Sequence, residues 1–324
     1  MRVGRWIQGA ALFAVTSLVA FGVCADSYPS RPVRIIVAYA AGGATDSLAR
    51  QLSVPAGEKL GQSVVVENKP GGATVIAAQT LIQSAPDGYT MAIFDPSTVA
   101  MNQYLFKKPP YDPAKTIAPV SMLTKIPFGI MVRADHPMKT LSEFVAQVKA
   151  KTAVTYGHSG AGNPVHLAME RFLAQAGLQM THVPYRGGAP ALSDLMGGQV
   201  GYLMMDIPSA MPFIKDGKVR VLAVTSAKRT EMLPNVPTIA ESGYAGYEAT
   251  SWFGAFVPAG TPAEVIEKLS RTLRETVARP EVTAWIKDRT LEPATSTPEE
   301  LAAVIKSDEV KYSQIIKQLN FSLD

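Results

Sequence analysis

From residue 33 the chain alternates between short apolar runs and longer amphipathic ones. Three short runs rich in β-branched side chains predict β-strands: residues 33–39, 63–68 and 89–95. Residues 45–60 and 72–85 place apolar side chains at helical spacing, and Pro55 is expected to end or bend the first of these helices. Strands that alternate with helices favour a parallel sheet covered on both faces.

The same alternation restarts near residue 120. Further strands are predicted at 121–133, 153–157, 181–185, 202–206 and 219–226, and helices at 142–150, 163–177 and 189–200. Pro164 and Gly177 are placed to begin and end one of these helices. The last third is mostly helical, with two capping boxes that carry Pro at the first helical position: Thr261-Pro262-Ala263-Glu264 and Thr297-Pro298-Glu299-Glu300.

The two α/β units are joined without a flexible linker. The joins near 120–127 and 224–230 have the composition of strands, which predicts two lobes connected by short strand-like crossings. Such a hinged arrangement favours a ligand cleft between the lobes. We therefore expect a discontinuous first domain at residues 26–122 and 228–324, and a second domain at 123–227.

The first 25 residues have a different pattern. Arg2 and Arg5 precede an apolar stretch, and Val23-Cys24-Ala25 has the small residues of a cleavage site. This pattern predicts a cleaved secretory signal peptide, with an uncleaved anchor or a lipid-anchored Cys24 as alternatives.

Composition removes several classes of function. Charged residues are 18% and hydrophobic residues 47% of the chain, as in globular proteins. Without residues 1–25 the chain has no cysteine and its formal charge falls from +4 to +2, which excludes disulfides and cysteine-ligated zinc. No basic run exceeds two residues, so nucleic-acid binding has no support. No later apolar stretch approaches the ~18 residues of a membrane span.

Gly-Gly-Ala-Thr occurs twice, each time between a predicted strand and a predicted helix. The first copy, residues 42–45, is followed by Asp46, and a glycine-rich turn at a helix N-terminus can bind an anion through free backbone N–H groups. The alternative is an ordinary turn in which Thr45 or Asp46 caps the helix. The second copy, residues 71–74, has no acid, and an ordinary turn is expected there. The nucleotide-binding patterns G-x-G-x-x-G and G-x-x-x-x-G-K-[ST] are absent.

Residues 155–167, TYGHSGAGNPVHL, admit two interpretations. Gly157-His158-Ser159-Gly160-Ala161 nearly matches the G-x-S-x-G nucleophile elbow of an exported serine hydrolase. However, Glu170 is the only acid between Ser159 and the last histidine, His182, which is too early for the usual triad acid. The other interpretation is a second anion-binding loop that faces the first across the cleft, with His166 either orienting the loop or lying in the core.

Asp206 ends an apolar strand, where open α/β sheets place ligand contacts. It is expected either to receive a ligand amine or hydroxyl or to cap the following turn. Metal binding has little support, because the sequence offers four histidines and no H-E-x-x-H or carboxylate cluster. We expect no metal and no cofactor.

An ordered set of motifs resembles the Bug (TctC-type) family of periplasmic receptors of tripartite tricarboxylate transporters. From about residue 28 to the C-terminus these motifs are YPSRPVRIIVAYAAGGATDSLARQL, VENKPGGAT, APDGYTMAI, YGHSGAGNPVHLAMERF, VPYRGGAPALSDLMGGQV, IKDGKVRVLAVTS, PTIAESG and FVPAGTP. The resemblance implies a type II periplasmic-binding-protein fold with two crossing strands as the hinge. It also implies a small carboxylate ligand, such as a di- or tricarboxylate, an acidic amino acid or an aromatic acid.

In this family the carboxylate sits between loops that match Ala41–Asp46 and Thr155–Asn163 here, often with ordered waters at the first loop. The sequence departs from the family pattern beside this pocket, at Tyr39-Ala40-Ala41, at His158 and at FDPSTVAMN (94–102). These departures leave the identity of the ligand open. The candidate ligand-binding residues are Tyr39, Ala41, Gly42, Gly43, Thr45, Asp46, Asp95, Ser97, Thr155, His158, Ser159, Gly160, Ala161, Gly162, Asn163, Tyr185 and Asp206.

The function expected from the sequence is that of a monomeric, non-enzymatic periplasmic receptor. It captures a small carboxylate by closure of the cleft and delivers it to the integral-membrane subunits of a transporter. Two alternatives remain at this point: an exported hydrolase that uses Ser159, and a ligand sensor that signals to a two-component sensor kinase.

Overall fold

The computed structural model describes residues 28–151, 153–185, 187–319 and 321–323, so the predicted signal peptide lies outside the described residues. The strands are β1 (Val33–Val37), β2 (Val64–Asn68), β3 (Thr90–Phe94), β4 (Ile117–Arg133), β5 (Thr155–His158), β6 (Thr181–Pro184), β7 (Leu203–Asp206), β8 (Val219–Val224), β9 (Thr250–Pro258) and β10 (Glu292–Pro293). The α-helices are α1 (Ala44–Leu60), α2 (Val75–Ile82), α3 (Asn102–Leu105), α4 (Pro113–Thr116), α5 (Leu141–Ala150), α6 (Pro164–Ala176), α7 (Gly188–Met196), α8 (Ile207–Lys215), α9 (Ala263–Val277), α10 (Pro280–Asp288) and α11 (Pro298–Leu319). Two short turns of other helix types complete the list: η1 (Gly72–Thr74) and η2 (Ser97–Met101).

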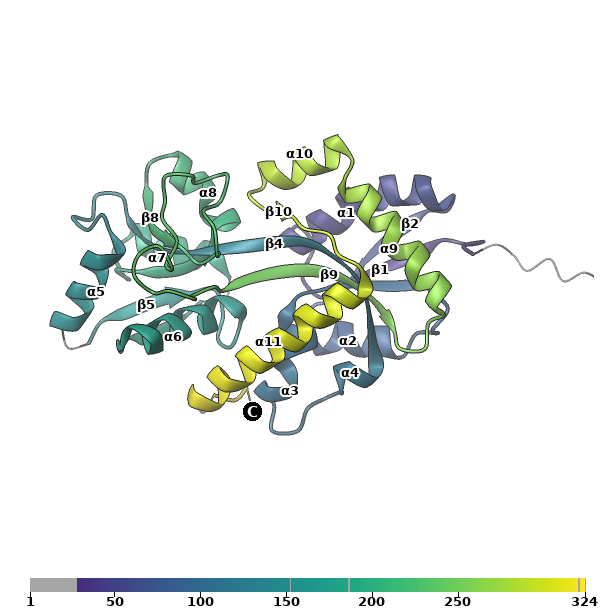
Figure 1. Cartoon of the computed structure of the whole chain (residues 1–324), viewed down its shortest axis with the longest axis horizontal. Helices are drawn as coiled ribbons and strands as arrows, with labels where there is room; N and C mark the ends of the chain where they lie inside the picture. Colours follow the sequence, from purple (N-terminus) through teal and green to yellow (C-terminus); the bar gives the residue numbers. More distant parts are fainter. Residues whose placement is uncertain (1–27, 152, 186, 320, 324) are drawn as a thin grey trace, which may run out of the picture.

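The described strands form one continuous sheet in the order β2-β1-β3-β9-β4-β7-β5-β6, with β8 and β10 also pairing with β4. β1 runs parallel to β2 and β3, and β5 runs parallel to β6 and β7. The antiparallel strands β4 and β9 pass between these two parallel groups (Figure 1). The sequence pattern therefore predicted the fold class correctly: a two-lobed α/β protein with two crossing strands.

We call the part built on β1–β3 lobe 1 and the part built on β5–β8 lobe 2. The first crossing, β4, includes the predicted join at 120–127. The second crossing comes later than predicted. Residues 225–249 form irregular structure that remains with lobe 2, where the Tyr247 hydroxyl donates to the Ala168 carbonyl (2.8 Å), and β9 then makes the crossing. The sequence pattern missed this because the β-branched end of β8 continues into residues that do not pair as a strand.

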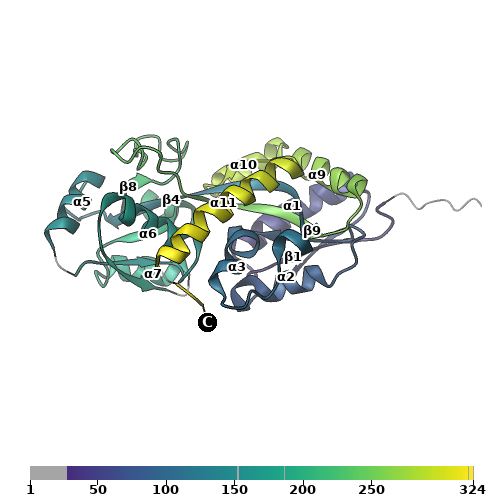
Figure 2. The ribbon, with the colours of Figure 1, turned by 60° about the horizontal axis from the view of Figure 1, so that its bottom comes forward.

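Helices cover both faces of the lobe 1 sheet. α1 and α9 pack together, and α2 packs against β1 and β3 (Figure 1). The long helix α11 packs against β4 and η2 in lobe 1 and against α6 in lobe 2, so it lies across the junction of the lobes (Figures 1 and 2). The largest apolar cluster extends through both lobes along the crossing strands, from Leu48 and Leu52 to Phe144 and Phe172.

Several local expectations can be compared with the structure. α1 continues through Pro55 to Leu60, because buried Leu52 and Leu60 hold both sides of the proline against the core. The capping box at Thr297 is present: its hydroxyl accepts from the Glu300 N–H (3.2 Å), and the Glu300 carboxylate accepts from the Thr297 N–H (2.9 Å). The box at Thr261 is absent, because the Thr261 hydroxyl donates to the Pro258 carbonyl (2.8 Å) and closes the turn after β9.

Among the described helices, none combines the length and the apolar character that crossing a bilayer requires.

The cleft between the lobes as candidate functional site

A cleft of about 550 Å³ lies between the two lobes. Loops at the carboxyl ends of β1, β3, β5 and β7 border it, and Ile126, Phe128 and Phe253 of the crossing strands contribute apolar side chains. The sheet order explains this convergence, because both parallel groups direct their carboxyl ends toward the junction of the lobes. The cleft is therefore a product of the topology and not of one loop.

The first glycine turn connects β1 to α1. Gly42 has a φ of +84°, which L side chains rarely adopt, and its N–H donates to Asp46 Oδ2 (2.9 Å). In the described part of the chain, the N–H groups of Ala44 and Thr45 have no protein acceptor, as expected in the first turn of a helix. These two amides are available to an anion in the cleft.

Asp46 does not lie on the cleft, contrary to the prediction. Its side chain is buried and accepts hydrogen bonds from the Arg50 guanidinium (Nε, 3.0 Å), from the Gly42 N–H and from Asn68 Nδ2 (2.9 Å). The bond from Arg50, followed by those from Gly42 and Asn68, lowers the pKa of Asp46 to about 2. Asp46 therefore fixes the shape of the turn, and its carboxylate is not a ligand contact.

The second loop, residues 159–163, connects β5 to α6. Asn163 Oδ1 accepts from the His166 N–H (2.9 Å) and caps α6, and Pro164 is its first residue, as predicted. The N–H groups of Ser159 and Ala161 have no acceptor among the residues that the structure describes. Two amides on this loop are thus available to an anion, as in the first turn.

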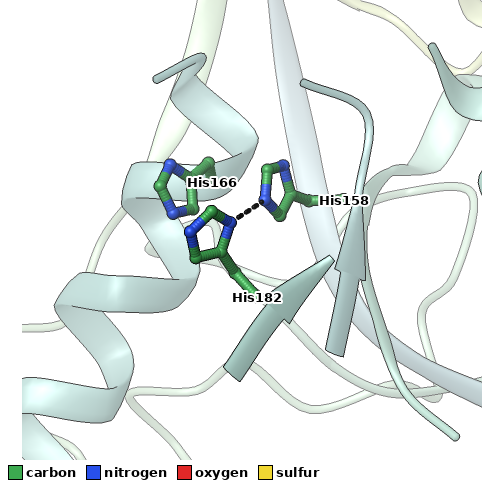
Figure 3. Close-up of side chains that lie close together, drawn as sticks. All are labelled: His158, His166 and His182. Atoms are coloured by element: carbon green, nitrogen blue, oxygen red, sulfur yellow. Dashed lines mark hydrogen bonds between the residues drawn. The ribbon is translucent and has the colours of Figure 1, made fainter. Parts of the chain in front are cut away.

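Two buried histidines accept hydrogen bonds from backbone amides of the second loop, and Figure 3 shows their rings beside that of His182. The N–H of Gly160 donates to His158 Nδ1 (3.2 Å), and the N–H of Gly162 donates to His166 Nδ1 (3.1 Å). Because each Nδ1 accepts, the ring proton of each neutral histidine is on Nε2. His166 is thus buried and also accepts from the loop, so both roles considered from the sequence apply to it.

His158 lies behind the loop and not on the cleft, which corrects its prediction as a ligand contact. Its side chain is fully buried, and its Nε2 lies 3.2 Å from His182 Nδ1. Burial, and secondarily the positive charge that His182 would carry, lowers the pKa of His158 to about 4. Burial also lowers the pKa of His166 to about 3, with His158 and His182 adding to the effect. Both rings are neutral at pH 7 and can accept.

The cluster of His158, His166 and His182 brings one nitrogen of each ring within 4.8 Å of the others, which sequence spacing did not indicate. The rings of His158 and His166 are stacked, with centroids 4.3 Å and planes 14° apart. Their in-plane lone pairs therefore run side by side and do not converge on one ion. If a metal ion were bound by Nε2, the ring proton would lie on Nδ1. Nδ1 could then no longer accept a hydrogen bond from the loop amide. In this arrangement the cluster supports the loop.

The other predicted residues divide into two groups. Those that line the cleft are Tyr39, Gly43, Thr45, Asp95, Ser97, Ser159, Gly160, Ala161, Gly162, Asn163 and Asp206. Ala41 and Gly42 belong to the first turn but do not line the cleft. Thr155 is exposed at the opposite end of β5, and the Tyr185 hydroxyl donates to Asp194 Oδ2 (2.7 Å), away from the cleft. A loop matched by sequence thus also contains residues that do not line the cleft.

One part of the site was not predicted from the sequence. The second Gly-Gly-Ala-Thr turn also lines the cleft, contrary to the expectation of an ordinary turn. Its Ala73 and Thr74 have φ values of 50° and 74°, a strained conformation for residues other than glycine. Asn102 Nδ2 holds this turn by donating to the Ala73 carbonyl (2.8 Å). The repetition of the motif was the available signal.

Two carboxylates line the cleft, one from each lobe. In lobe 1, Asp95 accepts from the Tyr39 hydroxyl (2.6 Å) and from the Ser97 N–H (3.1 Å). In lobe 2, Asp206 Oδ1 accepts from the Ser209 N–H (2.8 Å) and caps α8, so this acid both caps a helix and lines the cleft. Burial raises the pKa of Asp95 and of Asp206.

The arrangement around Ser159 does not form a hydrolytic triad. The Ser159 hydroxyl accepts from Asn163 Nδ2 (3.1 Å), while the ring of the adjacent His158 faces His182 and Gly160. Glu170, the only acid in the interval, accepts from the Tyr156 hydroxyl (2.5 Å). Ser159 thus has no base positioned to activate it among the described residues.

Comparison with known proteins agrees with this geometry. Residues 48–321 match the model of the TctC family, the tripartite tricarboxylate transporter family receptor. The chain is 31% identical to protein BugT of Bordetella pertussis over the full length of both proteins. It resembles the structure of R. palustris Rpa4515 with adipate (32% identity, TM-score 0.81, 91% of this chain and 99% of the other). It also resembles Rhodopseudomonas palustris MatC with bound malate (30% identity, TM-score 0.76, 89% and 100%).

Each of these matches covers most of the chain. The matched family is a family of receptors, and the two solved structures contain bound small carboxylates. The hydrolase alternative is therefore rejected. The chain belongs to the TctC family of tripartite tricarboxylate transporter receptors, and the protein is a non-enzymatic periplasmic solute-binding protein.

Proposed function

We propose that this receptor binds a small carboxylate between its lobes and delivers it to the integral-membrane subunits of a tripartite tricarboxylate transporter. One observation carries the proposal: free main-chain amides from both lobes border the same cleft. Ala44 and Thr45 supply them from lobe 1, and Ser159 and Ala161 supply them from lobe 2.

Neutral amides suit this task. Each hydrogen bond to a charged group contributes about 1.5–3 kcal/mol, and no cation has to be desolvated to make it. A ligand that contacts both loops binds the closed form better than the open one, so ligand binding shifts the population toward closure. A transporter can then recognise the closed shape. The carboxylates in the structures of Rpa4515 and MatC support this ligand class for the present chain.

A thermal-shift panel on ligand-free, refolded protein tests the proposal. At a ligand concentration of 100 times Kd, binding stabilises the native state by about 2.7 kcal/mol. For a protein of this size we expect at least one small carboxylate to raise Tm by about 5 °C. A neutral sugar and an alkylammonium salt serve as controls and should leave Tm unchanged. A shift with either control, and with no acid, would reject carboxylate binding.

Delivery to a transporter needs a separate experiment. A bacterial strain that lacks only this receptor is expected to lose uptake of the acid identified by the panel and to regain it when the receptor gene is restored. Normal uptake in the deleted strain would reject the delivery step and leave the binding result intact.

A further inference from the structure

We propose that the ligand is an amino-carboxylate, a small molecule whose carboxylate meets the loop amides and whose other end carries a cationic nitrogen. This inference rests on the proposed function and specifies the chemical class that the same cleft selects. Three features of the cleft support it: the sign of its charges, a buried acceptor without a donor, and the order of the strands.

The charged side chains that line the cleft are all acidic. Asp95 and Asp206 line the cleft from opposite lobes, and none of the described lining residues is Lys, Arg or His. Neither carboxylate forms an ion pair with any residue of the described ranges. Asp95 is buried and Asp206 is partly exposed in the cleft. An unpaired buried charge is costly, and both acids attract the opposite charge, so they favour a ligand that brings a positive charge.

A second feature points the same way. Asn102 lines the cleft, and its Nδ2 is used by donation to the Ala73 carbonyl and to the Thr74 hydroxyl. Its Oδ1 is buried and has no hydrogen-bond partner among the described residues. Buried polar atoms are rarely left unpaired, so a ligand donor that reaches this carbonyl oxygen when the lobes move would complete its hydrogen bonding.

The strand order sets the orientation of the ligand. Asp95 follows β3 and Asp206 follows β7, and each of these strands lies beside the crossing pair β9-β4. The amide loops follow β1 and β5, one strand farther out in each lobe. Adjacent strands are about 4.8 Å apart, so in each lobe the acid and the amides are separated by roughly one strand spacing. A ligand with a carboxylate at one end and an ammonium group a few atoms away matches both positions.

A dicarboxylate does not match as well. With one carboxylate on the loop amides, its second carboxylate would face Asp95 and Asp206 with no described cation beside them. Like charges at this separation repel each other. The preference therefore depends on the two acids, and neutralising them should remove it.

Calorimetric titration of the ligand-free protein with matched pairs tests the proposal. Each pair has the same methylene chain and differs only at one end: β-alanine and succinate, 4-aminobutyrate and glutarate, 5-aminopentanoate and adipate. For at least one chain length, we expect the amino acid to bind about tenfold to hundredfold more tightly than its diacid.

Two variants identify the cause. Asp95→Asn and Asp206→Asn remove one charge each but keep an oxygen that can accept from Tyr39 or from the Ser209 N–H. Each is expected to weaken the best amino-carboxylate by about tenfold or more and to reduce the gap to its diacid. Asp216→Asn, which makes the same change at an exposed acid paired with Lys218, should have no effect.

Three results would overturn the proposal. Tighter binding of the diacids in wild-type protein would reject the amino-carboxylate class while supporting the proposed function. An unchanged preference in both cleft variants would show that these acids do not set it. If neither series nor the matching monocarboxylates propionate, butyrate and pentanoate bind, this inference fails, and the proposed function fails with it only if no acid of the thermal-shift panel binds either.

Discussion

In His158→Leu, the affinity for the carboxylate ligand is expected to fall by about tenfold to hundredfold, because the N–H of Gly160 loses its buried acceptor. The bond from Gly160 to His158 fixes the loop so that the amides of Ser159 and Ala161, on either side, stay free for the ligand. Without that bond the loop no longer holds these two amides in place. In His158→Asn, the amide oxygen lies near the former position of Nδ1, so most of the affinity should return. Calorimetric titration at pH 7 measures both effects.

Acid pH tests whether the buried His158 ring is neutral in the folded protein. The pKa of His158 is about 4 in the folded protein and about 6.5 in an unfolded chain, so the unfolded state takes up the proton first. Stability from neutral His158 is full above about pH 6.5 and is lost as the pH falls through 4. His166 stacks on the same ring, and its pKa of about 3 places its own loss of stability at lower pH.

His158→Asn cannot be protonated. Its free energy of unfolding should therefore fall less than that of wild type between about pH 6.5 and 4. His136→Asn is the matched control, since His136 lies outside the cleft and its Nδ1 accepts from the Met138 N–H (3.2 Å). Wild-type affinity in His158→Leu, or equal losses in the Leu and Asn variants, would contradict the role assigned to this ring.

Asp46→Ala is expected to lower the free energy of unfolding by about 3 kcal/mol at pH 7, since several donors lose one buried acceptor together. The Gly42 N–H would be left unpaired, Asn68 Nδ2 would keep only its hydrogen bond to the Tyr39 carbonyl, and Arg50 would lose its carboxylate partner. The ligand should also bind more weakly, because the turn that presents the lobe 1 amides is no longer fixed. Chemical denaturation measures the first effect and titration the second.

The pH dependence of this carboxylate has a defined sign. The pKa of Asp46 is lowered from 3.8 to about 2, so its contribution is present above about pH 4 and is lost as the pH falls through 2. That shift corresponds to a stabilisation of about 2.5 kcal/mol. Because Asp46→Ala lacks the carboxylate, its free energy of unfolding should not show this loss in acid. Asp216→Ala, at an exposed ion pair, should change little. Equal stability of Asp46→Ala and wild type would show that the turn does not depend on this carboxylate.

The regular elements were predictable because their patterns are local. The β-branched runs became β1, β2 and β3, and the Asn163-Pro164 start of α6 was visible in the sequence. The second crossing was misplaced for the opposite reason: residues 225–249 resemble their neighbours in composition, and their attachment to lobe 2 depends on distant contacts such as Tyr247 with Ala168.

The candidate site was likewise only partly predictable from local sequence. The two loops could be found from glycine and helix-cap signals, but the role of each side chain within them could not. His158 and Asp46 were expected on the cleft and instead support its loops, because their hydrogen-bond partners come from β6, β2 and α1. Tyr39 and Asp95, two departures from the family pattern, form one hydrogen bond in the cleft. A sequence cannot show that two such changes meet.

A crystal structure with the ligand identified by titration tests the central claim most directly. The account predicts closed lobes, with the carboxylate oxygens within hydrogen-bond distance of the amides of Ala44 or Thr45 and of Ser159 or Ala161, directly or through one water molecule. A carboxylate bound outside the cleft would contradict the account. So would a carboxylate that side chains hold in the cleft with no contact to these four amides.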